Sequence, residues 1–155
     1  MVSIKWCLQH KDGISLIEPN SNMSDSYIKM AEESIASLES VQQSKLWTAV
    51  MSYYIFYYSL YSLMIKLGVK CEIHSCSLEF MKQYLGHFYN AQDAEMIKNA
   101  IRAREDLQYY ADRPVDDSKV DEIRTYCKVF FIKTKDILAR ITEEQVKAIR
   151  ESLAA

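Results

Sequence analysis

The chain has 155 residues and a net charge of −2, which is the length of a single domain. The nearly balanced charge excludes a generally basic nucleic-acid-binding protein, so any contact with RNA is expected at a local patch or pocket. The sequence contains only three glycines and two prolines. This scarcity argues against a β-sandwich or barrel, whose many tight turns need these residues, and favours helices.

The first 20 residues differ from the rest. Residues 4–8 and 14–17 favour strands, and Asp12-Gly13 between them is a turn signal. This pattern predicts a short β-hairpin that must pack on the remainder of the chain, with Trp6 as its anchor. We therefore divide the chain into an N-terminal hairpin extension, residues 1–20, and a helical bundle, residues 21–155.

From about residue 24 onward the apolar residues recur with helical periodicity. The expected helices cover approximately residues 24–38, 44–67, 75–85, 93–110, 118–138 and 142–153. Residues 44–67 are apolar nearly all round, which is typical of a helix buried at a bundle centre or in a subunit interface. The sequence predicts an all-α fold, an up-and-down bundle of four to six helices with a small N-terminal β-hairpin.

No membrane-spanning or targeting segment is expected. The most apolar stretch, residues 49–67, carries five tyrosines and is too polar to face lipid. The beginning of the chain lacks the apolar run of a signal peptide, which predicts a cytoplasmic protein. In that compartment the four cysteines are expected to be reduced.

Residues 70–76 form the first cluster with chemical potential. Cys71, His74 and Cys76 are possible metal ligands, but they lack the spacing of a zinc knuckle. We interpret the thiols as small buried hydrophobes and predict neither a metal nor a cofactor. For His74 two interpretations are open: a structural role in capping backbone groups, or proton transfer and phosphate binding near neutral pH.

Arg104 belongs to a second cluster, residues 101–110. It shares a helix flank with Ile97 and Leu107, whereas Arg102 points away, about 200° round the helix. We expect Arg104 to point partly inward, where a guanidinium needs an anionic partner. That partner is either a carboxylate inside the bundle or the phosphate of a ligand.

A stripe of tyrosines occupies the long apolar helix, at positions 53, 54, 57, 58 and 61. Such a stripe usually belongs to a core or a dimer surface, although it is also able to stack on nucleic-acid bases. Its hydroxyl groups indicate a hydrogen-bonded rather than a purely apolar interface.

The order of four short motifs resembles the HEPN superfamily, and most closely its branch of small uncharacterised prokaryotic HEPN-domain proteins. The motifs are residues 52–57 (Ser-Tyr-Tyr-Ile-Phe-Tyr), residues 67–70 (Leu-Gly-Val-Lys), residues 73–75 (Ile-His-Ser) and residues 104–109 (Arg-Glu-Asp-Leu-Gln-Tyr). The resemblance extends from about residue 27 to residue 138. It implies a helical bundle that forms a homodimer through its central helices.

The resemblance also implies a function. HEPN proteins often act as toxins paired with a minimal nucleotidyltransferase, and active members are metal-independent endoribonucleases. By position, His74 and Arg104 match the catalytic pair, in which the histidine moves a proton and the arginine offsets charge on the phosphate. Lys70, Ser75 and Tyr109 are the further candidates for binding RNA or nucleotide.

One departure from the family pattern leaves catalysis open. The nuclease motif places an arginine a few residues before the histidine, and here only Lys66 and Lys70 stand in that region. Lysine cannot form the two parallel hydrogen bonds that arginine makes with a phosphate. The alternative interpretation is a non-catalytic interaction module within a nucleotidyltransferase complex.

Overall fold

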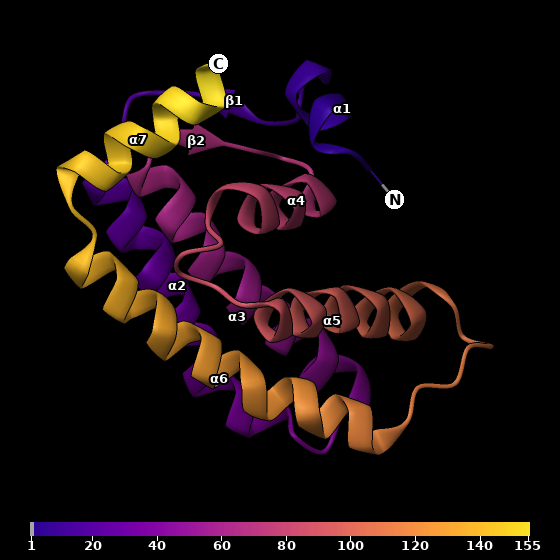
Figure 1. The fold of residues 1–155 in the computed structure, drawn as a ribbon. Coiled ribbons are helices and arrows are strands. Elements are labelled where there is room, and N and C mark those ends of the chain that lie inside the picture. The colour runs from indigo at the N-terminus through magenta and orange to yellow at the C-terminus, as the bar shows by residue number, and fades with distance from the viewer. Residues whose placement is uncertain (1) are drawn as a thin grey trace.

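The structure is a computed structural model that describes residues 2–155. It is mostly helical, with a small two-stranded antiparallel sheet (Figure 1), as the sequence predicts. The elements, in chain order, are α1 (Ile4–Gln9), β1 (Ser15–Leu16), α2 (Ser21–Leu38), the 3-10 turn η1 (Glu39–Val41), α3 (Lys45–Lys66), β2 (Val69–Lys70), α4 (His74–Tyr84), α5 (Ala91–Tyr109), α6 (Asp117–Arg140) and α7 (Glu143–Ala154).

Helix α3 is the centre of the bundle. It packs against α2, α5 and α6, and most of its side chains are buried, including Tyr53, Phe56 and Leu63. Ser44 begins the helix by accepting a hydrogen bond from the backbone N–H of Trp47, which satisfies one of the unpaired donors of the first turn. The nearly all-apolar sequence of α3 is therefore explained by neighbours within one chain.

Three of the surrounding helices, α2, α5 and α7, begin at residues whose side chains cap them. Asn20, four residues before the expected start at about residue 24, caps α2, because its side chain accepts a hydrogen bond from the N–H of Met23. Asn90 and Asp93 form a reciprocal capping box at the start of α5, and Thr142 and Gln145 form another at α7. The expected start of the last helix at about residue 142 agrees with α7, and such short-range signals fix where these helices start.

The two-stranded sheet exists, but it does not lie within residues 1–20. Strand β1 pairs antiparallel with β2, with Ser15 opposite Lys70 and Leu16 opposite Val69. Residues 4–8, which the sequence predicts as a strand, form the helix α1, which Ser3 caps. In residues 4–8 the fold overrides the β-propensity of the sequence. The partner of β1 lies some fifty residues away in the chain, after the central helix.

The expectation of reduced thiols is wrong for two of the four cysteines. Cys7 of α1 and Cys76 of α4 form a disulfide across a sequence separation of 69 residues, with their Cα atoms 5.6 Å apart. Cys71 and Cys127 are free and buried. The predicted anchor, Trp6, is 43% exposed, and its ring lies tilted against the ring of His10. Cys7, which is fully buried, attaches the N-terminal segment to the bundle instead.

Gly68 and Arg150 connect the two ends of the chain to the end of α3. Gly68 has φ of +74°, a left-handed conformation that favours glycine. A Cβ at this position would overlap Arg150 and the carbonyl oxygen of Ile17. The Arg150 Nη1 donates to the carbonyl oxygens of Ile17, Leu67 and Gly68 at 2.9, 2.9 and 3.0 Å. Helix α7 is thereby attached to β1 and to the turn before β2.

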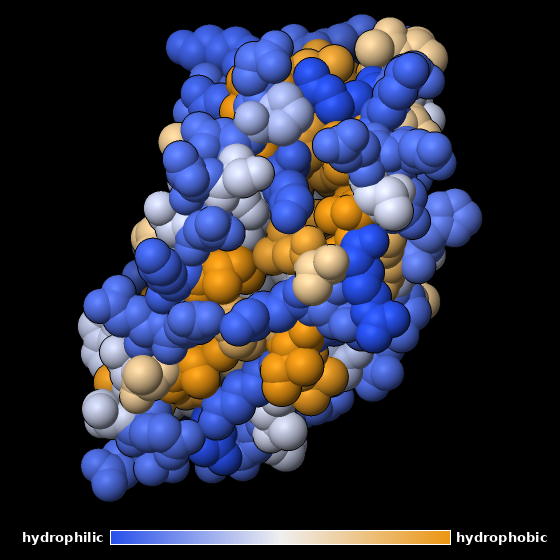
Figure 2. Space-filling model, turned by 90° about the vertical axis from the view of Figure 1, so that its left-hand side faces the viewer, coloured by the Kyte–Doolittle hydropathy of each residue, from blue (hydrophilic) through white to orange (hydrophobic). Residues whose placement is uncertain are grey.

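On the face formed by the left-hand side of Figure 1, mainly hydrophilic side chains surround apolar groups that gather in the middle and lower parts of the view (Figure 2). Among the large apolar side chains of the described residues, Ile132 of α6 is the most exposed, at 66%. Among residues 2–155, no helix combines the length and the apolar character needed to cross a membrane.

Candidate functional site

His74 is the first residue of α4 and lies half-buried against the central helix. Its Nδ1 is hydrogen-bonded to the hydroxyl of Tyr53, and its ring lies 4.4 Å from the ring centroid of Tyr57. Tyr53 and Tyr57 are four residues apart on α3, so they present neighbouring rings on one face. The imidazole is therefore held at a defined orientation by two tyrosines.

Arg104 of α5 lies on the other side of Tyr53. Its Cζ is 4.6 Å from the centroid of the Tyr53 ring, and 5.9 and 5.8 Å from the centroids of Tyr54 and Tyr109. These distances are within the range of cation–π attraction. The inward orientation expected for Arg104 is thus confirmed, and both His74 and Arg104 contact the same tyrosine. We call His74, Tyr53 and Arg104 the His–Tyr–Arg cluster.

Arg104 has no carboxylate partner among residues 2–155. Its Nη1 donates only to Gln108, at 3.3 Å, and its Nε is buried without a hydrogen-bond partner. An ion pair between Arg104 and a carboxylate inside the bundle, one of the two expected partners, is therefore absent from the described residues. A half-buried guanidinium with unused donors has the chemistry to bind an anion such as a phosphate.

The electrostatics of the cluster follow from burial and from Arg104. Burial, followed by the positive charge of Arg104, lowers the pKa of His74 below its usual range, so the imidazole is neutral at pH 7. Burial raises the pKa of the Tyr53 hydroxyl, partly offset by Arg104. At neutral pH the cluster thus consists of an uncharged imidazole, an un-ionised phenol and one cation.

The inner side of the cluster is tightly packed. Tyr53, Tyr57 and His74 border a cavity of only about 10 Å³, which is at the lower limit for a single water. A ligand would therefore have to approach from the outer side. That side carries Arg104 and Tyr109, whose ring is 63% exposed and free to stack on a planar group.

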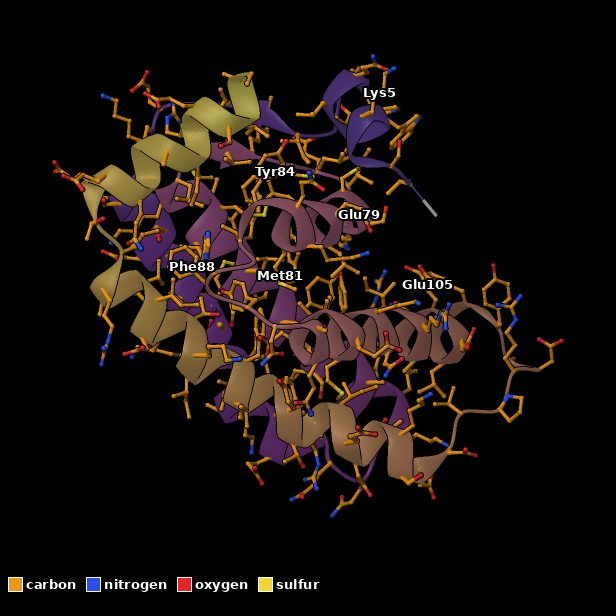
Figure 3. All side chains as sticks on the ribbon, in the orientation of Figure 1. Lys5, Glu79, Met81, Tyr84, Phe88 and Glu105 are labelled. Atoms are coloured by element: carbon orange, nitrogen blue, oxygen red, sulfur yellow. A yellow bond between two sulfur atoms is a disulfide. The ribbon has the colours of Figure 1, made fainter. Side chains whose placement is uncertain are left out.

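The other two candidates, Lys70 and Ser75, lie outside the cluster. Lys70 is on β2 and forms an exposed ion pair with Glu72 at 3.1 Å. Ser75 is exposed and borders a groove of about 730 Å³ between α4 and α5. Figure 3 shows Glu79 and Glu105 on the two sides of this groove. The structure brings His74, Arg104 and Tyr109 together, but it does not bring Lys70 to them.

The tyrosine stripe is divided between core and surface. Tyr53 and Tyr61 are buried, whereas Tyr54, Tyr57 and Tyr58 are half-buried. Tyr27 of α2 extends the half-buried part, with its ring 6.2 Å from that of Tyr58. This strip is the part of α3 that α2, α5 and α6 leave partly open.

Nothing in the sequence identifies Tyr53 and Tyr57 as the partners of His74. Their positions in the stripe were visible, but the stripe alone does not tell which tyrosine faces α4. The possible ligand set Cys71, His74 and Cys76 is not available to a metal, since Cys76 is bonded to Cys7. Within residues 2–155 no group of three or more potential ligands is close enough to hold an ion.

Comparison of the chain with protein-family models, with curated proteins and with solved structures finds no match. The resemblance to the HEPN superfamily therefore depends on the sequence motifs alone.

Proposed function

We propose that this protein binds RNA or a nucleotide through a phosphate group at the His–Tyr–Arg cluster. The observation that supports the proposal best is Arg104, a half-buried cation without a carboxylate partner in residues 2–155. A guanidinium in this state gains a strong charge-assisted hydrogen bond when a phosphate arrives. The exposed ring of Tyr109 beside it supplies a surface on which a base stacks.

RNA cleavage is the second candidate function. It is favoured by the neutral imidazole of His74, which accepts a proton at pH 7, next to a cation that stabilises a charged phosphate. Against it stands the missing upstream arginine of the family motif. The alternative that we propose is a non-catalytic module that binds a minimal nucleotidyltransferase. Membership of the HEPN superfamily is also part of the proposal.

We further propose that two copies associate through Tyr27, Tyr54 and Tyr58 of the half-buried tyrosine strip. This strip combines partly exposed aromatic area with hydroxyl groups, as protein interfaces often do. Because Tyr54 also contacts Arg104, association there would place the two His–Tyr–Arg clusters near the same seam.

The test of phosphate binding uses a short fluorescent single-stranded RNA and the variants Arg104→Ala and Arg102→Ala. Arg102 is the matched control, because it is an exposed arginine on the same helix that points away from Tyr53. Loss of charge-assisted hydrogen bonds is expected to raise the Kd of Arg104→Ala about tenfold or more, while Arg102→Ala stays near wild type. Fluorescence anisotropy measures both values.

Equal weakening of RNA binding in the two variants would show that RNA is attracted by charge without a specific site, and would disprove the assignment of the site to Arg104. Gel analysis of the same RNA after incubation distinguishes the two candidate functions. Cleavage that disappears in His74→Ala supports an endoribonuclease. Intact RNA that is nevertheless bound supports the non-catalytic module.

A further inference from the structure

The disulfide is the main attachment of α1 to the rest of the molecule. Helix α1 has six residues, and Cys7 is its only buried side chain. Of its three large apolar side chains, Trp6 and Leu8 are 43% and 40% exposed, and Ile4 is only partly buried against the core. A helix this short is not stable in water without tertiary contacts, so the bond from Cys7 to Cys76 has the largest share in holding α1 in place.

The segment that follows α1 is attached independently of the disulfide. The N–H of Glu72 donates to the carbonyl oxygen of Asp12, and Ser15 and Leu16 pair with β2. Release of α1 would therefore stop at about residue 11, and the two-stranded sheet would remain.

At its other end the disulfide joins the first turn of α4. Cys76 is the third residue of this helix, which begins at His74. Ile73 precedes it and provides no side-chain cap, so the first N–H groups lack the usual side-chain acceptor. The turn that carries His74 is thus fixed in part through Cys76.

We propose that the Cys7–Cys76 bond is a reversible redox clip, which a dithiol reductant opens to release α1 and loosen the first turn of α4. The inference does not depend on the ligand proposed for the His–Tyr–Arg cluster. Val2 and Ser75 both border the groove between α4 and α5, so the release of α1 also removes part of the groove wall.

The reaction is a thiol–disulfide exchange. One thiolate of the dithiol attacks a sulfur of the disulfide, and the second thiolate resolves the mixed disulfide. Two electrons and two protons pass to the protein, leaving Cys7 and Cys76 as thiols and the reductant as a cyclic disulfide. Both cysteines are fully buried, so the reductant reaches them when α1 opens locally, a motion that exposes one fully buried side chain of α1 and the partly buried Ile4.

The nearby free thiol does not substitute for the external reductant. Cys71 is buried, and this burial raises the pKa of its thiol. It therefore stays protonated at neutral pH and is a poor nucleophile toward the disulfide.

The experiment is hydrogen–deuterium exchange of the full chain, oxidised and after reduction with dithiothreitol. Alkylation followed by mass spectrometry verifies the state of Cys7 and Cys76. We expect amide exchange in residues 4–9 and 74–77 to accelerate on the order of tenfold or more on reduction, while α5 and α6 are unchanged. Unchanged protection of the α1 amides after complete reduction would overturn the proposal. Faster exchange throughout α5 and α6 would also overturn it, because the disulfide would then stabilise the whole fold and not only α1 and the start of α4.

Two variants add an independent measurement. Cys7→Ser is expected to show the reduced pattern without reductant and to respond no further. Cys127→Ser, which alters a buried cysteine outside the disulfide, is the matched control and should keep the full response. Absence of the disulfide from the oxidised wild-type protein would also disprove the clip.

Discussion

Arg104 and His74 influence each other through the ring of Tyr53. The guanidinium lies over one side of this ring, and the imidazole is hydrogen-bonded to its hydroxyl. Neither residue by itself indicates in the sequence that it interacts with the other. Their common contact with one buried tyrosine is what makes them a single electrostatic unit.

This coupling gives a prediction for the titration of His74. Burial and Arg104 both lower the pKa of the imidazole, so Arg104→Ala should raise it while leaving it below its usual value of about 6.5. Titration of the His74 ring by NMR measures the change. The variant Arg102→Ala again serves as the control, and an unchanged or lower pKa in Arg104→Ala would contradict the coupling.

The same shift predicts how stability depends on pH. Because the pKa of His74 is lower in the folded state, the unfolded chain takes up the proton first as the pH falls. The contribution of His74 to stability is therefore complete above about pH 6.5 and decreases as the pH falls toward the pKa of the folded state. Urea denaturation should show a smaller decrease over this window in Arg104→Ala than in wild type.

At the scale of elements, a buried carboxylate connects α5 to α6. The side chain of Asp93 is fully buried and forms an ion pair with Lys133 at 2.7 Å. It also accepts hydrogen bonds from the hydroxyl of Tyr126 at 2.7 Å and from the N–H of Asn90 at 2.8 Å. Burial and the bond to Asp93 raise the pKa of Tyr126 to about 12. One residue thus caps α5 and fixes its partner helix.

Asp93→Asn should destabilise the protein substantially. The change leaves the ammonium of Lys133 without its counter-ion, and we expect a loss of about 2–3 kcal/mol in the free energy of unfolding, below the cost for a fully buried pair because Lys133 reaches solvent. Asp136→Asn is the control, since it removes an exposed pair with Arg140 worth at most about 0.5 kcal/mol. Equal urea midpoints for the two variants would show that the buried pair contributes nothing.

At the scale of the whole molecule, the proposed dimer makes a prediction about the half-buried tyrosine strip. Tyr58→Glu places a charge in the proposed seam and should convert a dimer into a monomer, because a buried unpaired carboxylate is costly. Ile132→Glu makes a similar change on α6, at a side chain that is 66% exposed, and should leave the dimer intact. Sedimentation velocity measures both. A monomeric wild-type protein at micromolar concentration would rule out the seam.

Much of the architecture was predictable because it depends on residues close together in the chain. Ser44 and the capping box at Thr142 mark helix starts that the structure confirms, and the apolar character of residues 44–67 identifies the central helix. The inward orientation of Arg104 followed from its place on a helix flank. Short-range hydrogen bonds and helical periodicity carry these signals without any knowledge of the fold.

The pairing of distant segments was decided only by the tertiary structure. The path of the chain around α3 determines which strand pairs with β1 and which cysteine bonds to Cys7. It also determines which carbonyl groups accept hydrogen bonds from Arg150. The candidate site divides in the same way: the sequence supplied His74, Arg104 and Tyr109, whereas Tyr53 became their link only when α4 and α5 packed on α3. Contacts across large sequence separations leave no periodic or neighbouring signal, because they are selected by the packing of whole helices.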